Sequence, residues 1–159
     1  MNIIYLSIGS NIGNRQELLA RTRKRIMEKI GPISQESSVY ETESWGFDGN
    51  PFLNQVISVE SGLDPKEVLE EIINIEEKFG RKRKGKKYEN RIIDIDILFY
   101  NDEIVRDARL VVPHKEIENR KFILEPLNEI APRMIHPVIE KEINTILKEC
   151  KDQKKVIKI

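Results

Sequence analysis

The chain has a single cysteine, Cys150, among 159 residues, which excludes an intrachain disulfide and a cysteine-based zinc cluster. No apolar run approaches the roughly 20 residues that a membrane-spanning helix needs. Net charge is also lacking, because 27 basic residues balance 27 acidic ones. The molecule as a whole therefore has no long-range attraction to nucleic acid or to an anionic membrane, and any electrostatic binding must be local.

The first residues lack the basic segment and the small-residue cleavage site of a secretory signal, so the expected location is the cytoplasm. A length of 159 residues, with 39% hydrophobic and 34% charged residues, predicts one soluble globular domain over residues 1–159. A monomer is the default expectation. The chain contains no G-x-x-x-x-G-K-[ST] loop, which excludes a P-loop nucleotidase.

The order of predicted elements indicates the fold class. Strands are expected at residues 3–8, 34–42, 52–61 and 92–100, and helices at 15–30 and 64–79. Shorter elements are expected at 103–106, as a hairpin partner of 92–100, and as helical stretches near 115–124 and 140–150. The order β-α-β-β-α-β is typical of an α+β, ferredoxin-like split βαβ fold, in which both helices cover one face of an antiparallel sheet. The other face is expected to stay open for a site.

Two aspartates in the strand at 92–100 are the most informative residues. Alternation places Asp94 and Asp96 on one face of the strand, with Cα atoms roughly 6.6 Å apart. Paired carboxylates attract a hard cation such as Mg²⁺, which relieves their mutual repulsion. An isolated Asp-x-Asp is more often a solvated strand face, but the flanking apolar face and a nearby basic segment favour a metal site. That apolar face is predicted to contain Ile93, Ile95, Ile97 and Phe99.

A basic segment at residues 81–87 precedes this strand. It has three interpretations: a solvated linker, a phosphate-binding surface for RNA, or a lid that brings arginines onto a polyphosphate held by Mg²⁺. The lid is favoured because it alone uses the neighbouring aspartates, since arginine forks phosphate oxygens and stabilises the charge that develops in phosphoryl transfer. Further on, His114, Arg120 and Phe122 are candidates whose residue types alone are more often structural.

A series of motifs, in order, carries a family resemblance. They are Gly9-Ser10-Asn11, Tyr40-Glu41-Thr42 with Trp45-Gly46, Phe52-Leu53-Asn54, Glu76 with Gly80-Arg81-x-Arg83, Arg91-x-x-Asp94-x-Asp96, Arg109-Leu110 with Val112-Pro113-His114, and Asn119-Arg120-x-Phe122. On these residues the chain resembles the 6-hydroxymethyl-7,8-dihydropterin pyrophosphokinases over nearly its whole length. The resemblance implies transfer of pyrophosphate from ATP, the co-substrate, to the pterin, which leaves AMP, in folate biosynthesis.

The resemblance also implies a role for each matched residue. Two Mg²⁺ ions would be bridged by Asp94 and Asp96, and Arg83 and Arg91 would complete the catalytic set. The pterin would contact Thr42, Trp45, Phe52, Asn54 and Phe122, with the two phenylalanines sandwiching its ring. ATP would contact Glu76, Arg81, Arg83, Arg91, Arg109, His114 and Arg120. No nucleic acid or membrane partner is implied.

Two other functions fit part of the pattern. A noncatalytic RNA-binding module would use the basic segment 81–87, although the chain lacks an RRM-type aromatic segment. A phosphotransferase with another alcohol acceptor would keep Asp94 and Asp96. It would not need Phe52, Asn54 and Phe122 together, and that trio favours the pterin.

Overall fold

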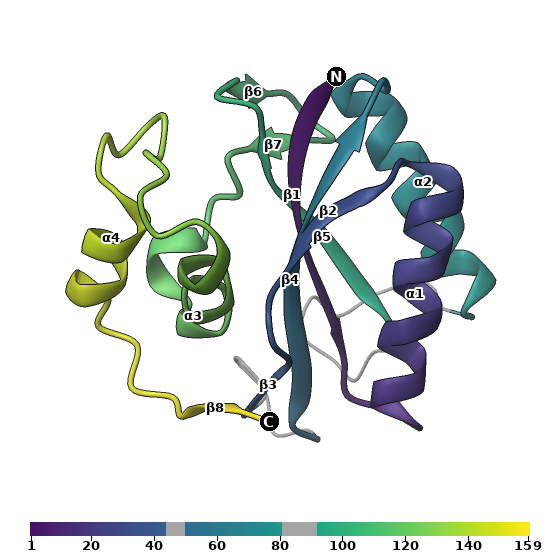
Figure 1. The fold of residues 1–159 in the computed structure, drawn as a ribbon, viewed down its shortest axis with the longest axis horizontal. Coiled ribbons are helices and arrows are strands. Elements are labelled where there is room, and N and C mark those ends of the chain that lie inside the picture. Colours follow the sequence, from purple (N-terminus) through teal and green to yellow (C-terminus); the bar gives the residue numbers. More distant parts are fainter. Residues whose placement is uncertain (44–49, 81–91) are drawn as a thin grey trace.

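A central antiparallel sheet separates two helical layers in the computed structural model, which describes residues 1–43, 50–80 and 92–159 (Figure 1). Within those residues the sheet has six strands, in the order β5-β1-β4-β3-β8, with β2 also paired to β4. The strands are β1 (Asn2–Ser10), β2 (Ile33–Glu36), β3 (Tyr40–Thr42), β4 (Phe52–Ser61), β5 (Asp94–Tyr100) and β8 (Val156–Lys158). The α+β class and the antiparallel sheet that the sequence predicts are confirmed.

Helices α1 (Arg15–Lys29) and α2 (Pro65–Lys78) cover one face of the sheet, close to the bounds expected from the sequence. The Asn14 side chain caps α1 by accepting from the backbone of Glu17. A capping box opens α2, in which Asp64 and Glu67 satisfy each other's backbone N–H groups. The buried stripes of both helices pack with the sheet in one core that includes Ile4, Leu6, Leu19, Ile26, Val68, Ile72, Ile93 and Ile95.

The opposite face is also covered, so the expectation of an open face is wrong. Three helical elements lie there: η1 (Ile117–Asn119), α3 (Lys121–Ile130) and α4 (Ile143–Glu149). They bury a second core against the sheet, with Val56 and Leu98 from the strands and Leu124, Leu127 and Ile146 from the helices. Apolar side chains on both faces of β4 and β5 require a cover on both sides, and the second half of the chain supplies it.

The bulge in β5 corrects a further expectation. Pairing with β1 shifts register between Tyr5 and Leu6, so that Tyr5 pairs with Phe99 and Leu6 with Ile97. Phe99 consequently faces α3 and α4 and does not continue the apolar face formed by Ile93, Ile95 and Ile97. The alternation that places Asp94 and Asp96 on one face continues to Leu98 and fails at Phe99.

Three shorter elements differ from the sequence-based expectations. The predicted strand 34–42 is divided into β2 and β3, because Ser37 turns inward and bonds to the backbone of Val56. Residues 103–106 do not pair with β5; instead β6 (Val105–Arg106) pairs with β7 (Val111–Val112), across a turn in which the Asp107 side chain accepts two backbone N–H groups. Strand β8 was not expected. In the described part of the chain, no helix is long and apolar enough to cross a membrane.

Candidate active site

Three strands meet at the end of the sheet where β1 ends, and they bring the predicted site residues together. Gly9 of β1 pairs with Asn54 of β4 on one side and with Asp94 of β5 on the other. Directly paired residues point to the same face, so Asn54 and Asp94 lie on the α3 side of the sheet with one strand between them. Two strand spacings separate them by about 9.6 Å.

The aspartate pair lies on the half-buried stretch of β5. Asp96 pairs with Ser7 as Asp94 pairs with Gly9, so both carboxylates share the α3 face. Between them, the Ile95 N–H, on the side of β5 away from β1, donates to Oε2 of Glu76 at 2.9 Å. Glu76 is 1% exposed, and this bond fixes the backbone from which both aspartates project. One Glu76 carboxylate oxygen is therefore used in a hydrogen bond to the backbone of β5.

The pterin candidates form a second cluster on β3 and β4. Thr42 pairs with Phe52, and the Asn54 amide donates to Oγ1 of Thr42 at 3.1 Å, with both polar side chains buried. A Cβ placed on Gly9 would lie 2.8 Å from Oδ1 of Asn54. Because Asn54 is buried and bonded to Thr42, it cannot move away cheaply. The close approach at this point therefore requires glycine.

His114 and Arg120 form a third group near Asp94, whose charge acts on the His114 imidazole. Burial and, to a smaller extent, the Arg120 charge lower the pKa of His114 to about 4, while the Asp94 and Glu116 charges act in the opposite direction. The imidazole is thus neutral near pH 7, and its Nδ1 accepts from the backbone of Glu116 at 3.1 Å. Nε2 then carries the proton and is a neutral donor. The Arg120 guanidinium lies 5.7 Å from the centre of the Phe122 ring, which links this group to the aromatic candidate.

Not every predicted residue joins this group. Arg109 is exposed on the turn between β6 and β7, and that turn lies by the start of α2, where Lys66 and Asp107 approach to 3.9 Å. The turn between β6 and β7 is at the other end of β5 from Asp94 (Figure 1). The candidates Trp45, Arg81, Arg83 and Arg91 lie outside the described residues, as does the whole basic segment 81–87.

Sequence reasoning missed Glu129 of α3. Its carboxylate accepts from the Ser38 backbone and hydroxyl and from the Tyr40 hydroxyl, the last at 2.6 Å. Burial and the bond to Glu129 raise the pKa of Tyr40 far above its usual value, so the hydroxyl remains the donor. An isolated acid in a helix carries no sequence signal for such a contact. Its effect is to fasten α3 to β3, the strand that ends at Thr42.

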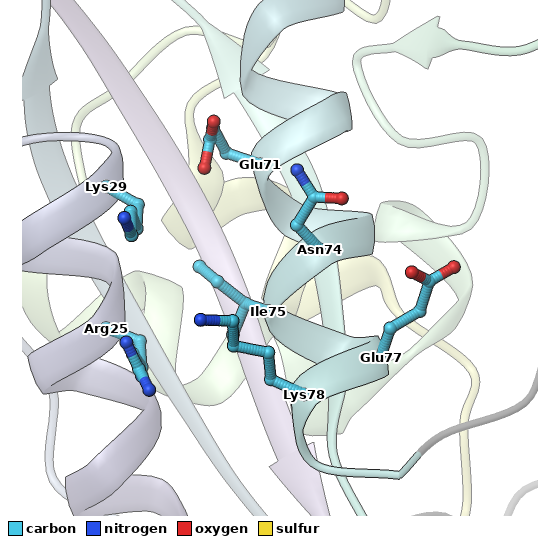
Figure 2. A pocket seen from close by; sticks show the side chains of 7 residues that line it. All are labelled: Arg25, Lys29, Glu71, Asn74, Ile75, Glu77 and Lys78. Carbon is cyan, nitrogen blue, oxygen red and sulfur yellow. The ribbon is translucent and has the colours of Figure 1, made fainter.

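A groove of about 400 Å³ lies on the opposite face, between α1 and α2 (Figure 2). Arg25, Lys29 and Lys78 border it together with Glu71 and Glu77. Charges of both signs alternate around this groove, and the sheet separates it from Asp94 and Asn54. It contains none of the predicted site residues.

The donor set at the aspartates fits magnesium. No group of three or more His, Cys, Asp or Glu side chains that could hold a metal ion occurs in the part of the chain that the structure describes. Zinc sites of structural or catalytic type take at least three protein ligands, whereas Mg²⁺ is commonly held by one or two carboxylates together with substrate phosphates and water. Asp94 and Asp96 supply such a pair.

Comparison with known proteins decides the family. Residues 5–132 match the model of the 7,8-dihydro-6-hydroxymethylpterin-pyrophosphokinase (HPPK) family, a range that contains every candidate described above. The chain belongs to the HPPK family. It is 41% identical over 145 residues to the 2-amino-4-hydroxy-6-hydroxymethyldihydropteridine pyrophosphokinase of Aquifex aeolicus, covering 90% of this chain and 89% of the relative. The enzyme of the same name from Bacillus subtilis is 36% identical over 135 residues, covering 84% and 80%.

Solved structures of the family share the fold. Wild-type Plasmodium falciparum HPPK-DHPS aligns with a TM-score of 0.73 at 20% identity, covering 93% of this chain. This chain spans only 44% of that longer HPPK-DHPS chain. At this identity the likeness establishes that the present chain has the HPPK fold.

Proposed function

We propose that this protein catalyses Mg²⁺-dependent transfer of pyrophosphate from ATP to 6-hydroxymethyl-7,8-dihydropterin in folate biosynthesis, giving AMP and the pterin diphosphate. One observation carries the proposal: Asn54 and Asp94 flank Gly9 on the same face of the sheet. This arrangement supports the assignment of a flat polar ring and a metal-bound polyphosphate to neighbouring positions. The names of the relatives support the same reaction.

The transfer itself needs two substrates held in line above Gly9. The hydroxymethyl oxygen of the pterin forms a bond to the β-phosphorus of ATP, the bond from that phosphorus to the oxygen shared with the α-phosphorus breaks, and the hydroxyl loses its proton. AMP leaves with the electron pair. Such a reaction depends mainly on positioning and electrostatic stabilisation, and it requires no covalent nucleophile.

The pterin is assigned to the cluster on β3 and β4. The buried Thr42 and Asn54 side chains, already bonded to each other, supply hydrogen-bonding groups to the ring edge. Phe52 and Phe122, each half-buried, supply the two aromatic faces. The proposal includes Trp45, which lies outside the described residues.

ATP is assigned to the other side of Gly9. Arg120 supplies charge to the phosphates, and neutral His114 supplies an N–H donor from Nε2. Glu76 acts through Ile95 on the aspartates. Arg109 belongs to the proposed ATP set on the family resemblance alone, because it lies on the turn at the other end of β5. The proposed set is completed by Arg81, Arg83 and Arg91, with Arg83 and Arg91 acting in catalysis.

Two Mg²⁺ ions are assigned to Asp94 and Asp96. Bound there, they would offset the negative charge of the triphosphate that approaches these carboxylates. The shared face of the two aspartates supports this assignment.

The test is AMP formation from ATP with and without the pterin, measured for the wild type and for Asp96→Asn. We expect AMP that depends on both pterin and Mg²⁺ in the wild type and almost none in the variant. Pterin-independent AMP would instead indicate a different acceptor. RNA binding with a steep salt dependence, and no pterin-dependent AMP, would favour the noncatalytic module built on residues 81–87.

The remaining parts of the proposal concern the molecule as a whole. The order β5-β1-β4, with β2 and β3 beyond β4 and one helix after each of β1 and β4, supports a ferredoxin-like split βαβ core. We assign residues 1–159 to a single pyrophosphokinase domain that acts as a cytoplasmic monomer with no nucleic acid or membrane partner. Sedimentation of the active protein checks the monomer.

A further inference from the structure

The C-terminal segment, residues 151–159, begins beyond the part of the chain that matches the family model, which ends at residue 132. It follows α4 and crosses back to the edge of the sheet, where β8 pairs with β3 (Figure 1). On this path it contacts two segments that are distant in sequence. One carries Phe122 and the other carries Thr42.

The first contact is made by Asp152 at the start of α3. Helix α3 has no capping side chain of its own, since its N-cap residue, Arg120, makes no such bond. Oδ2 of Asp152 accepts instead from the backbone N–H of Lys121 at 3.1 Å, while Oδ1 accepts from the Lys154 N–H at 3.0 Å. A carboxylate at this position satisfies an otherwise unused helix donor and favours the helix dipole. Phe122 is the next residue of the helix.

The second contact is made by β8 and the residues before it. Val156 of β8 pairs with Thr42, and the Lys154 ammonium lies 3.5 Å from the Glu43 carboxylate. Strand β3 has only three residues, so without β8 it would be a short edge strand paired on one side alone. Short edge strands open easily, and pairing on both sides holds the Thr42 backbone in place.

Helix α3 also contacts β3 and β8 directly, through Glu129. Glu129 bonds to Ser38 and Tyr40 at the other end of β3, and the Lys158 ammonium of β8 lies 4.0 Å from Glu129. Phe122 and Glu129 are seven residues apart, which is two turns and about 10.5 Å along one face of a helix. The C-terminal segment thus contacts both ends of the helix that carries Phe122 and the whole strand that carries Thr42.

We propose that the C-terminal segment is a positioning element for the pterin, and that Asp152 is its positioning residue. The segment touches no substrate itself. It holds the aromatic face offered by Phe122 at a fixed place relative to the Thr42 and Asn54 pair. This inference rests on the proposed function, because it assumes that those residues bind the pterin.

The first experiment compares Asp152→Ala with Asp152→Asn, which keeps an acceptor. Glu149→Ala is the matched control, because that exposed carboxylate pairs with Lys141 and not with α3. We expect Asp152→Ala to raise the KM for pterin about fivefold, the change that corresponds to a lost helix cap, with the KM for ATP unchanged. Asp152→Asn should recover most of the loss, and Glu149→Ala should behave as the wild type. Equal rises in both KM values, or no rise, would overturn the proposal.

The second experiment tests β8 through its backbone. Ile159 N–H donates to the Val39 carbonyl, so the alternation of an antiparallel ladder puts the Ile157 N–H at a bonded position facing Glu41. Ile157→Pro removes that donor, whereas Ile157→Ala removes only a side chain that is 57% exposed. We expect the proline variant alone to raise the KM for pterin and to speed amide exchange at Thr42. Unchanged exchange and KM in the proline variant would contradict a positioning role.

Failure of the proposed function gives a different result. If the wild type forms no pterin-dependent AMP, the proposed reaction is wrong whatever the variants do. Amide exchange at Phe122 and Thr42 in Asp152→Ala and Ile157→Pro then still reports whether the C-terminal segment holds these two residues. Faster exchange in each variant supports the mechanical part of the inference, and unchanged exchange removes it.

Discussion

The two faces of β5 serve opposite purposes within one strand. On the α1 and α2 side, Ile93, Ile95 and Ile97 are buried in the larger core. On the α3 side, Asp94 and Asp96 remain half-buried at the end of the sheet. Because side chains alternate, residues about 3.3 Å apart along the strand belong either to the core or to the proposed metal site.

The difference shows how a site can be built without weakening the fold. The charged pair occupies the end of its face, and the apolar cover of α3 and α4 packs farther along, over Leu98 and Phe99. The core face has no such division. Substitutions on the two faces should therefore separate activity from stability, and the following predictions test that separation.

The largest effect is expected on the aspartate face. Asp96→Asn keeps the size of the side chain but removes a metal-binding charge, so turnover should fall by about a thousandfold, or ~4 kcal/mol of transition-state stabilisation. The thermal midpoint should change little, because Asp96 faces away from the larger core and belongs to neither apolar cluster. Steady-state AMP formation and a melting curve on the same preparation check both halves. Near-normal turnover at ordinary Mg²⁺ would contradict the metal assignment.

The neighbouring position on the core face should behave in the opposite way. Ile95→Ala removes a side chain that is 2% exposed, and the free energy of unfolding should fall by about 2–5 kcal/mol. The kcat of the folded fraction at low temperature should stay close to that of the wild type. Chemical denaturation followed by fluorescence, with kinetics well below the midpoint, measures the two effects. A specific loss of kcat would show that the faces are not independent.

A smaller effect is expected at the aromatic position of α3. Phe122→Ala should weaken pterin binding by about 1–3 kcal/mol, the scale of base stacking on an aromatic side chain. ATP affinity should be nearly unchanged. Calorimetric titration with each ligand separates the two. Matching losses for both ligands would mean that Phe122 supports the fold and not the pterin.

The smallest effect concerns pH. Burial holds the pKa of His114 at about 4, below its ordinary value of 6.5, so the unfolded chain takes up a proton that the folded chain refuses. Stability is therefore complete above about pH 6.5 and declines as the pH falls toward 4. His136 is also buried with a lowered pKa and acts in the same direction. Denaturation of His114→Asn and of the wild type at pH 7 and 5 isolates the contribution of His114 to the loss of stability. An NMR titration midpoint near 6.5 for His114 would refute the lowered pKa.

Local patterns in the sequence predicted much of the fold and the shared face of Asp94 and Asp96. The alternation of residues 93–97 and the capping residues Asn14, Asp64 and Glu67 are short-range signals, and the structure follows them. The bulge at Leu98 and the short strand β8 are set by pairing with distant strands, so no local pattern reports them. The helical stretches near 115–124 and 140–150 were expected, but their packing over the second face depends on contacts with distant strands. Helix α3 extends past the expected end and contains Pro126, a residue typical of helix ends.

The site residues also divide into those with a local sequence signal and those without one. The Asp94 and Asp96 pair could be derived from strand alternation alone, whereas the roles of Thr42, Asn54 and Phe122 came from the family resemblance. Glu129 and Asp152 act through backbone groups far away in the sequence, and a lone acid gives no sign of its partner. Residues that position a site are in this respect harder to find than residues that compose it.

Gly9 places an unusual limit on how this sequence can vary. Most positions on a surface or in a core have a neighbouring residue type that is nearly equivalent, so a chain can drift through small steps. At Gly9 the smallest step, a single methyl group, already meets the Asn54 amide at 2.8 Å. Any side chain at this position therefore requires Asn54 to move, so a substitution of Gly9 is expected to disturb the pair of Asn54 and Thr42 whatever residue replaces it.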